Sequence, residues 1–374
     1  MAGVIASESA VYETVPAPYA PSWVDRVTDW VRGLRVPYWI MYLIPALVLF
    51  IITTVIKWED GSYAAAYAAG NKEGLFKLGP IYIYPFHAVP ELVTFYALAL
   101  MHYLDDVAQR ALDTYRPAMR TDEAHFKSLR YMLTNLPARP TLLASVGGVV
   151  FAVAVLVLIY SAAPDFTRQL LLFTSPAATV IESSVFVLLW WVWGALIYHT
   201  IRQLRLVSHI YTTYTRIDIF NLAPLYSFSW LTARTAIGSV LATYAFIVAA
   251  PGLMNNPITL GIMVFNLVFA AVAFAWPLVG VHRLLEEAKH GRMASSAQRF
   301  EILAAELHRR ADQGEFGSMG ELKDGLDALV NERNVVDKVY TWPWQRETVS
   351  GLSTALLLPI ILWIITKLLD GIIH

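Results

Sequence analysis

The feature that most constrains the fold of this chain is the length of the stretches that carry no charged side chain. The longest, Thr235–Val281, runs for 47 residues without Asp, Glu, Lys or Arg. Because a helix of about 20 mostly apolar residues crosses a bilayer, this stretch is long enough for two crossings. Turn-forming residues, Pro251-Gly252 and Asn255-Asn256-Pro257, divide it near the middle. The sequence therefore predicts a pair of membrane-spanning helices here.

Five further stretches have the length and apolarity of a membrane span. They are Val36–Ile56, Leu78–Leu104, Pro140–Pro164, Ser183–Ile201 and Thr348–Thr366. The whole chain is 57% hydrophobic and only 15% charged, whereas soluble domains average about 25% charged residues. This composition excludes a soluble enzyme and a disordered or fibrous chain. We predict an all-α polytopic membrane protein with seven transmembrane helices, in contact with the lipid bilayer of the plasma membrane (the inner membrane of a bacterium).

The distribution of basic residues predicts the orientation, because Lys and Arg in short loops concentrate on the cytoplasmic side. Seven spans with the N-terminus inside place 23 of the 28 basic residues in the cytoplasm. The count is the same if Leu78–Leu104 does not cross and the N-terminus is outside, since three N-terminal Arg then exchange sides with Lys57, Lys72 and Lys77. We choose seven spans because Leu78–Leu104 is long and nearly uncharged. Both alternatives place the C-terminus outside.

Four regions are predicted along the chain. Residues 1–35 form an N-terminal segment with an interfacial amphipathic helix, and residues 36–281 hold six transmembrane helices with cytoplasmic helical loops. Residues 282–345 form a cytoplasmic helical hairpin, because apolar residues recur at helical spacing on both sides of a glycine-rich turn. Residues 346–374 hold the last transmembrane helix and an external C-terminus. Spans four to six are predicted to extend beyond the membrane and to form, with the hairpin, a compact cytoplasmic bundle.

The N-terminal amphipathic helix is predicted from the spacing of its apolar residues. Trp23, Val24, Val27 and Trp30 share one face, whereas Asp25 and the other charged residues fill the opposite face. This pattern is typical of a helix that lies flat on a membrane surface.

Catalytic and cofactor-binding motifs are absent from the sequence. It contains no GxxxxGKS/T, GxGxxG, GxSxG or HExxH motif, so we expect no enzymatic activity. Without cysteine there can be no disulfide, Cys-ligated zinc or iron–sulfur cluster. The net charge of −1 shows no basic bias, and nucleic acid is therefore not an expected partner.

The second hydrophobic segment is interrupted by prolines. Pro80, Pro85 and Pro90 stand five residues apart, and proline favours the first turn of a helix. We therefore predict a helix that begins at Pro90, with residues 78–89 extended or re-entrant at the outer face. Glu91 then lies in the first turn, where a carboxylate is stabilised by the positive end of the helix dipole.

A functional alternative groups His87, Glu91 and Glu182 as a polar cluster at the outer mouth of a cavity. Ionisable residues within membrane segments are candidates for function. His87 and Glu91 supply only two ligands where a metal ion needs three or four, so no metal site is expected.

Two histidines raise the question of a haem. His102 and His199 stand at the predicted cytoplasmic ends of different spans, and a b-type haem needs two such ligands at one depth. His87 has no histidine partner at the outer side, and histidines at membrane interfaces are common without a ligand. We therefore expect no cofactor.

The last span is the best candidate for lining a pore. Its candidate pore residues are Ser350, Ser353, Thr354, Leu357, Ile360 and Thr366. Pro359 can bend this helix, and Pro343 is a predicted hinge between the cytoplasmic hairpin and the span. The alternative is an ordinary packed span with a proline kink.

This arrangement resembles the insect odorant and gustatory receptor superfamily of ligand-gated cation channels. The similarity lies in seven spans, a cytoplasmic N-terminus, spans that continue into the cytoplasm and a break at Pro343 before the last span. It implies four subunits that meet through a cytoplasmic bundle, a pore lined by the seventh span and a ligand pocket near the outer face. The TYxxxxQF motif of that superfamily is replaced here by TALLLPIILWI, so the resemblance assigns no individual residue.

The sequence thus favours an oligomeric ion channel or channel-like receptor, most simply a homo-oligomer, whose last helix lines the pore. The first alternative is a non-conducting membrane scaffold or an accessory subunit that binds other membrane subunits. A small-solute transporter is the second alternative, although a transporter is expected to show an internal repeat and matching broken helices.

Overall fold

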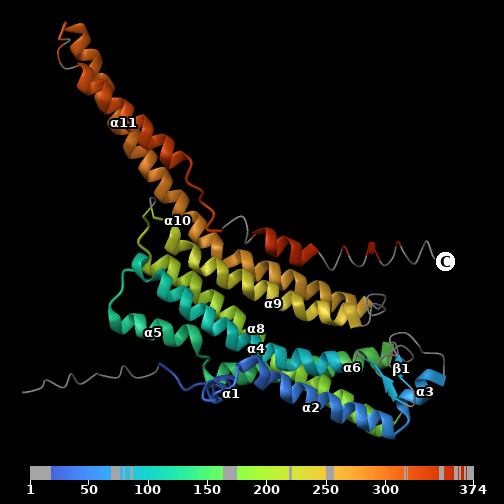
Figure 1. Cartoon of the computed structure of the whole chain (residues 1–374). Helices are drawn as coiled ribbons and strands as arrows, with labels where there is room; N and C mark the ends of the chain where they lie inside the picture. Colours follow the sequence, from blue (N-terminus) through green and yellow to red (C-terminus); the bar gives the residue numbers. More distant parts are fainter. Residues whose placement is uncertain are drawn as a thin grey trace, which may run out of the picture.

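The fold is a bundle of long helices with a two-helix arm at one end (Figure 1). The computed structural model describes residues 18–68, 76–78, 81–84, 87–162, 175–218, 221–249, 257–315, 317, 319–344, 349–357, 361, 364–365 and 368.

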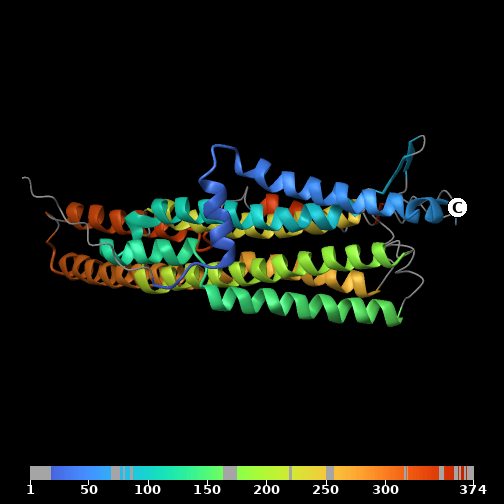
Figure 2. The same ribbon diagram turned by 90° about the horizontal axis from the view of Figure 1, so that it is seen from below.

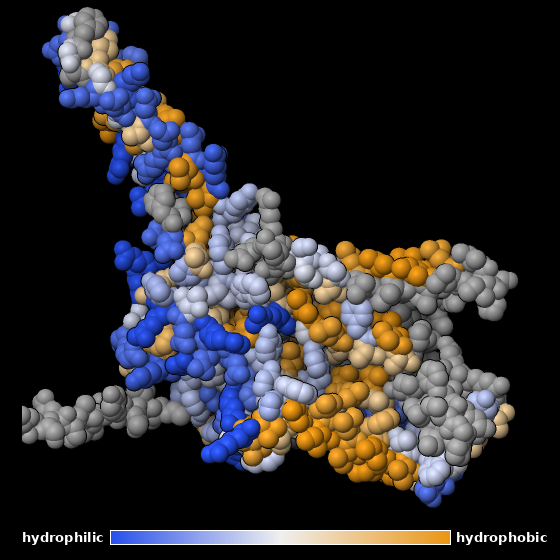
Figure 3. Space-filling view, viewed as in Figure 1, coloured by the Kyte–Doolittle hydropathy of each residue, from blue (hydrophilic) through white to orange (hydrophobic). Residues whose placement is uncertain are grey.

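Five of the described helices are long and apolar enough to cross a membrane. They are α2 (Tyr38–Glu59), α6 (Ala138–Ala162), α8 (Pro176–Tyr214), α9 (Ser227–Ala249) and α10 (Pro257–Asp312). Apolar side chains gather over this part of the surface, and hydrophilic ones gather over the arm and the adjoining end of the bundle (Figure 3). The chain is therefore an all-α membrane protein. The count of seven spans and their orientation stay predictions.

Helix α4 (Ala88–Tyr115) occupies the interior of the bundle. It packs against α2, α8 and α9, and buried side chains run along its whole length, from Val89 to Tyr115. At one end the rings of Tyr115, Tyr211 and Phe228 meet in pairs with centroids 5.2 to 5.4 Å apart. Aromatic contacts of this kind add to the stability gained from apolar burial.

Helices α6 and α8 approach each other at two glycines. A Cβ atom on Gly148 would lie 2.0 Å from the carbonyl oxygen of Trp190, and one on Gly194 would lie 2.3 Å from that of Ala144. Any larger residue would push the backbones apart, so these positions require glycine. The rest of α6 exposes large apolar side chains such as Leu143 and Val150, as expected for a helix in contact with lipid.

Helix α1 (Trp23–Arg32) runs across the long helices rather than along them (Figure 2). Its Asp25 is buried, which contradicts the prediction that it lies on a solvent face. The carboxylate accepts hydrogen bonds from the backbone N–H groups of Ser22 at 2.7 Å and Leu136 at 3.0 Å. It thereby caps α1 and ties it to the chain before α6. Burial raises the pKa of Asp25, although these hydrogen bonds act in the opposite direction.

The outer end of the bundle, which is the end predicted to be external, carries small elements. They are α3 (Ser62–Ala68) and a hairpin of strands β1 (Phe76–Leu78) and β2 (Ile81–Ile83), which pair antiparallel with Phe76 opposite Ile83. The expected extended chain before the second span is thus a short hairpin. Helix α4 begins at Ala88, two residues before Pro90, and Glu91 lies in its first turn as predicted.

The opposite end holds α5 (Glu123–Thr134), the 3-10 turns η2 (Arg116–Ala118) and η3 (Ala223–Tyr226), and the far ends of α4 and α8. Helices α8, α9 and α10 all continue beyond the predicted span boundaries, and the location of these continuations in the cytoplasm stays a prediction. The hairpin of α10 and α11 (Met319–Asp337) turns at Gly314, whose φ of +74° favours glycine. It projects as an arm (Figure 1), whereas the sequence predicted that it would pack into a compact bundle.

Whether α4 crosses the membrane can be tested by cysteine labelling. The cysteine-free chain allows single reporters at Ala64 in α3 and Ala124 in α5, both of which are exposed. In intact cells an impermeant thiol reagent is expected to label Ala64→Cys, and to label Ala124→Cys only after permeabilisation. Labelling of both variants in intact cells, or of neither, would place α3 and α5 on one side and contradict a crossing by α4.

Candidate functional site

A buried group of four ionisable side chains lies near the outer end of the bundle. This outer polar cluster consists of Lys57, His87, Glu91 and Glu182. Lys57 comes from the last turn of α2, and Glu182 projects from α8. His87 directly precedes α4, and Glu91 lies in the first turn of that helix. All four are between 0% and 4% exposed. Ionisable groups are rarely buried this completely, which makes the cluster the strongest candidate site.

Lys57 is the centre of the cluster. Its ammonium group forms an ion pair with the Glu182 carboxylate and approaches the Nδ1 atom of His87 at 2.7 Å. The hydroxyl of Tyr63 lies 3.3 Å from the same Nδ1 atom. The ion pair joins α2 to α8, and the contact with His87 adds the start of α4, so three helices meet at one cation.

Glu91 lies beside the ion pair without a direct bond to it. Its Oε1 atom is 3.0 Å from the hydroxyl of Thr53 on α2. Its Oε2 atom is buried and has no hydrogen-bond partner among the described residues. A buried carboxyl oxygen without a partner is unusual.

The structure thus brings together His87, Glu91 and Glu182, the three residues grouped from the sequence. It adds Lys57, which sequence analysis counted as a loop charge after the span Val36–Ile56. One sequence feature could have identified Lys57 as a member of the cluster: it directly follows a run of 21 uncharged residues. Helix α2 continues to Glu59, so the lysine falls on its buried side.

A second buried polar group lies further along α4 and α8, well inside both helices. His199 on α8 lies 2.8 Å from the Oδ1 atom of Asp105 on α4, and both residues are almost fully buried. His102 contacts the hydroxyl of Tyr42 through its Nδ1 atom at 3.2 Å and stacks on Tyr38. The two candidate haem ligands therefore have different protein partners. No group of three or more potential metal ligands occurs among the described residues.

The helix that begins the last span is described over residues 349–357. Leu352 is buried against α9 and α10, together with Val349 and Leu356. Ser350, Ser353, Thr354 and Leu357 are exposed. Of the remaining candidate pore residues, Ile360 and Thr366 lie outside the described residues.

The predicted hinge is held by a column of stacked aromatic rings. Phe274 on α10 stacks on Trp344, Trp344 on Trp342, and Trp342 on His282 of α10, with centroid separations of 5.7, 4.3 and 3.9 Å. Pro343, which separates the two tryptophans in the sequence, is buried. The segment between the arm and the last span is therefore fastened to α10 at two positions that are two helical turns apart.

No protein-family model matches the chain, and no curated protein or solved structure matches it.

The outer polar cluster predicts a large penalty for removing one member of its ion pair. In Lys57→Met the Glu182 carboxylate stays buried without its cation, and such a loss costs about 3–5 kcal/mol. We expect a clear fall in the Tm of the detergent-purified protein. The double variant Lys57→Met/Glu182→Leu should recover much of the loss, because no unpaired charge remains.

The matched control for this experiment is Arg116→Met, which breaks the exposed ion pair with Glu123. Exposed pairs contribute about 0–1 kcal/mol, so the control should leave the Tm nearly unchanged. Equal effects of Lys57→Met and Arg116→Met would show that Lys57 is not a buried, paired cation.

Proposed function

We propose that the chain is a subunit of an oligomeric ion channel or channel-like receptor in the plasma membrane, with its last helix lining a shared pathway. The observation that carries the proposal is the exposed hydroxyl-bearing face of the helix over residues 349–357. On the adjoining face, Val349, Leu352 and Leu356 contact α9 and α10. The polar face is therefore the one that a single chain leaves uncovered.

The spacing of the exposed residues supports this proposal. Ser350, Ser353, Thr354 and Leu357 follow the i, i+3, i+4, i+7 pattern of one helix face. Three of the four carry hydroxyls, in a region where most exposed side chains are apolar. Such a face suits the wall of a water-filled pathway that further copies of the chain would complete. Leu357, which is 53% exposed, is the apolar residue of this face. Its neighbour Leu356 belongs to the packed face.

The aromatic column supports a coupling between the arm and the pathway. Because Trp342 and Trp344 fasten the linker to α10, a change in the angle of the arm acts on the start of the last helix. In this proposal Pro343 is the point at which the chain changes direction.

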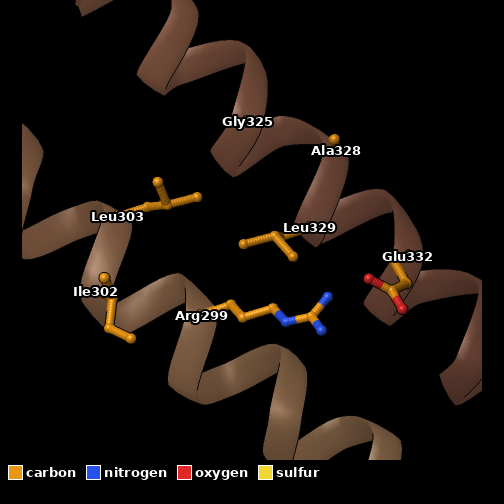
Figure 4. Close-up of a pocket in the computed structure, with 7 residues that line it drawn as sticks. All are labelled: Arg299, Ile302, Leu303, Gly325, Ala328, Leu329 and Glu332. Carbon is orange, nitrogen blue, oxygen red and sulfur yellow. The ribbon is translucent and has the colours of Figure 1, made fainter.

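The arm supports assembly into a homo-oligomer. A groove of about 480 Å³ lies between α10 and α11 (Figure 4), lined by Arg299, Ile302, Leu303, Gly325, Ala328, Leu329 and Glu332. Ile302 in this groove is 62% exposed, and Val330 and Val335 on α11 are 43% and 54% exposed. A two-helix hairpin is too small to bury a core of its own, so contact with another subunit would stabilise it.

The charges on the arm favour a second copy of the chain as that subunit. Helix α11 carries five acidic and two basic side chains, whereas residues 116–139, at the same end of the bundle, carry five basic and two acidic ones. Neighbouring copies in a ring can bring these surfaces together.

Two other functions compete with this proposal. A non-conducting scaffold or accessory subunit would use the same arm surface to bind other membrane proteins. A small-solute transporter is favoured by the buried charges of Lys57 and Glu182, since such groups mark substrate and ion pathways. We assign the chain no enzymatic activity and no cofactor.

Ion flux through reconstituted vesicles tests the proposal. Hydrophobic constrictions gate by excluding water, so Leu357→Ser should increase the leak of ions from vesicles that contain the purified protein. Leu156→Ser makes the same change in α6 and should not increase flux. If neither wild type nor Leu357→Ser conducts under any ionic condition, the channel is excluded in favour of the scaffold.

A further inference from the structure

We propose that the outer polar cluster is a proton-binding site, in which Glu91 holds one proton while Lys57 and Glu182 remain a charged pair. The site would make the packing of α2, α4 and α8 respond to pH. This inference does not depend on the channel function proposed above.

The charge balance of the site is the first argument. The groups that act directly on Glu91 are Thr53 and Lys57 on α2 and Glu182 on α8. His87 at the start of α4 contacts Lys57, and Tyr63 on α3 contacts His87. Asp60, at the end of α2, is exposed and bonded to Ser62 and Ser175. The single cation, Lys57, is already neutralised by Glu182. An ionised Glu91 would therefore leave one net negative charge in a fully buried site, which is strongly unfavourable.

His87 does not supply the missing positive charge. The Lys57 ammonium lies 2.7 Å from its Nδ1 atom and 3.1 Å from its Nε2 atom, and Nδ1 is 4.0 Å from the Oε1 atom of Glu182. A second cation this close to the buried ammonium is strongly unfavourable. The arrangement therefore fits a neutral His87, and Glu91 balances the site by taking up a proton itself.

The hydrogen bonds of Thr53 give an independent argument. Its hydroxyl oxygen is 3.0 Å from the Phe50 carbonyl oxygen and 3.0 Å from Glu91 Oε1. A hydroxyl has one proton to donate. If that proton goes to Phe50, as is common for threonine in a helix, the bond to Glu91 needs a proton on the carboxyl. The unpartnered Oε2 atom is then a neutral carbonyl oxygen, which is less costly to bury than a charged one.

The sign of the pH effect follows from proton linkage. Glu91 retains its proton in the folded protein, whereas in the unfolded chain it would be ionised at neutral pH. Because the folded state binds more protons, its stability falls as the pH rises. At high pH the deprotonated Glu91 lies beside Glu182 in the same buried site, and their repulsion loosens the contacts among α2, α4 and α8.

Glutamine substitutions test the site, because glutamine resembles a protonated glutamate in shape. The Tm of the detergent-purified wild-type chain should fall as the pH rises from mildly acidic to mildly alkaline. Glu91→Gln should keep the low-pH Tm and remove most of this fall. Glu182→Gln should lower the Tm at every pH by leaving Lys57 unpaired. Glu59→Gln, an exposed change on the same helix as Lys57, is the matched control and should behave as wild type.

Labelling with dicyclohexylcarbodiimide adds a chemical readout. This apolar reagent adds to a carboxyl group that carries a proton, and the adduct rearranges to a stable acylurea that peptide mass mapping locates. We expect modification of Glu91 that decreases with rising pH, and none at Glu182. The proposal is overturned if Glu91→Gln lowers the Tm as much as Glu182→Gln, if its Tm keeps the wild-type pH dependence, or if Glu182 is the carboxyl that is modified.

Discussion

The enclosure of α4 by α2, α8 and α9 is the constraint on which the rest of the structure depends. Most side chains of α4 between Val89 and Ala108 are buried, and a polar group in this part must find its partner within the protein. The buried ionisable groups of α4 lie in two places. Near its start, His87 contacts Lys57, which is paired with Glu182 beside Glu91, and further along the helix Asp105 meets His199. Between them the buried side chains are mostly apolar, so the charged contacts fix which helices lie beside α4 and at what height.

The second half of the chain is organised around α10. This helix packs on α8 and α9, carries the arm beyond the bundle, and holds the aromatic column that fastens residues 342–344. The helix over residues 349–357 therefore starts from a fixed point on α10 and leaves its hydroxyl-bearing face uncovered. One continuous helix thus connects the exposed arm to the exposed polar face, which is the geometry expected of a subunit that assembles through both.

The helices could be predicted from the sequence to a large extent, but the polar contacts could not. Uncharged runs locate α2, α6, α8, α9 and α10 because the bilayer demands long apolar segments. The same rule treats a charge at the end of a run as a boundary, so Lys57 was assigned to a loop. The burial of Lys57 depends on its ion pair with Glu182, which lies 125 residues further along the chain. Asp25 was assigned to the wrong helix face for a similar reason. Its carboxylate accepts a hydrogen bond from the backbone N–H of Leu136, and only the tertiary fold brings these two residues together. The arm was predicted as a hairpin, but helical spacing does not say in which direction it points.

The most direct test of the central claim is whether the polar faces of the last helices meet in the assembled protein. In the cysteine-free chain, Ser353→Cys places one thiol on the exposed face of residues 349–357, and Val150→Cys places one on the exposed face of α6. If the last helix lines a shared pathway, mild oxidation in membranes links Ser353→Cys subunits into disulfide-bonded dimers and leaves Val150→Cys subunits monomeric. Dimers formed by Val150→Cys and not by Ser353→Cys would contradict the account, because α6 rather than the last helix would then lie at the subunit contact.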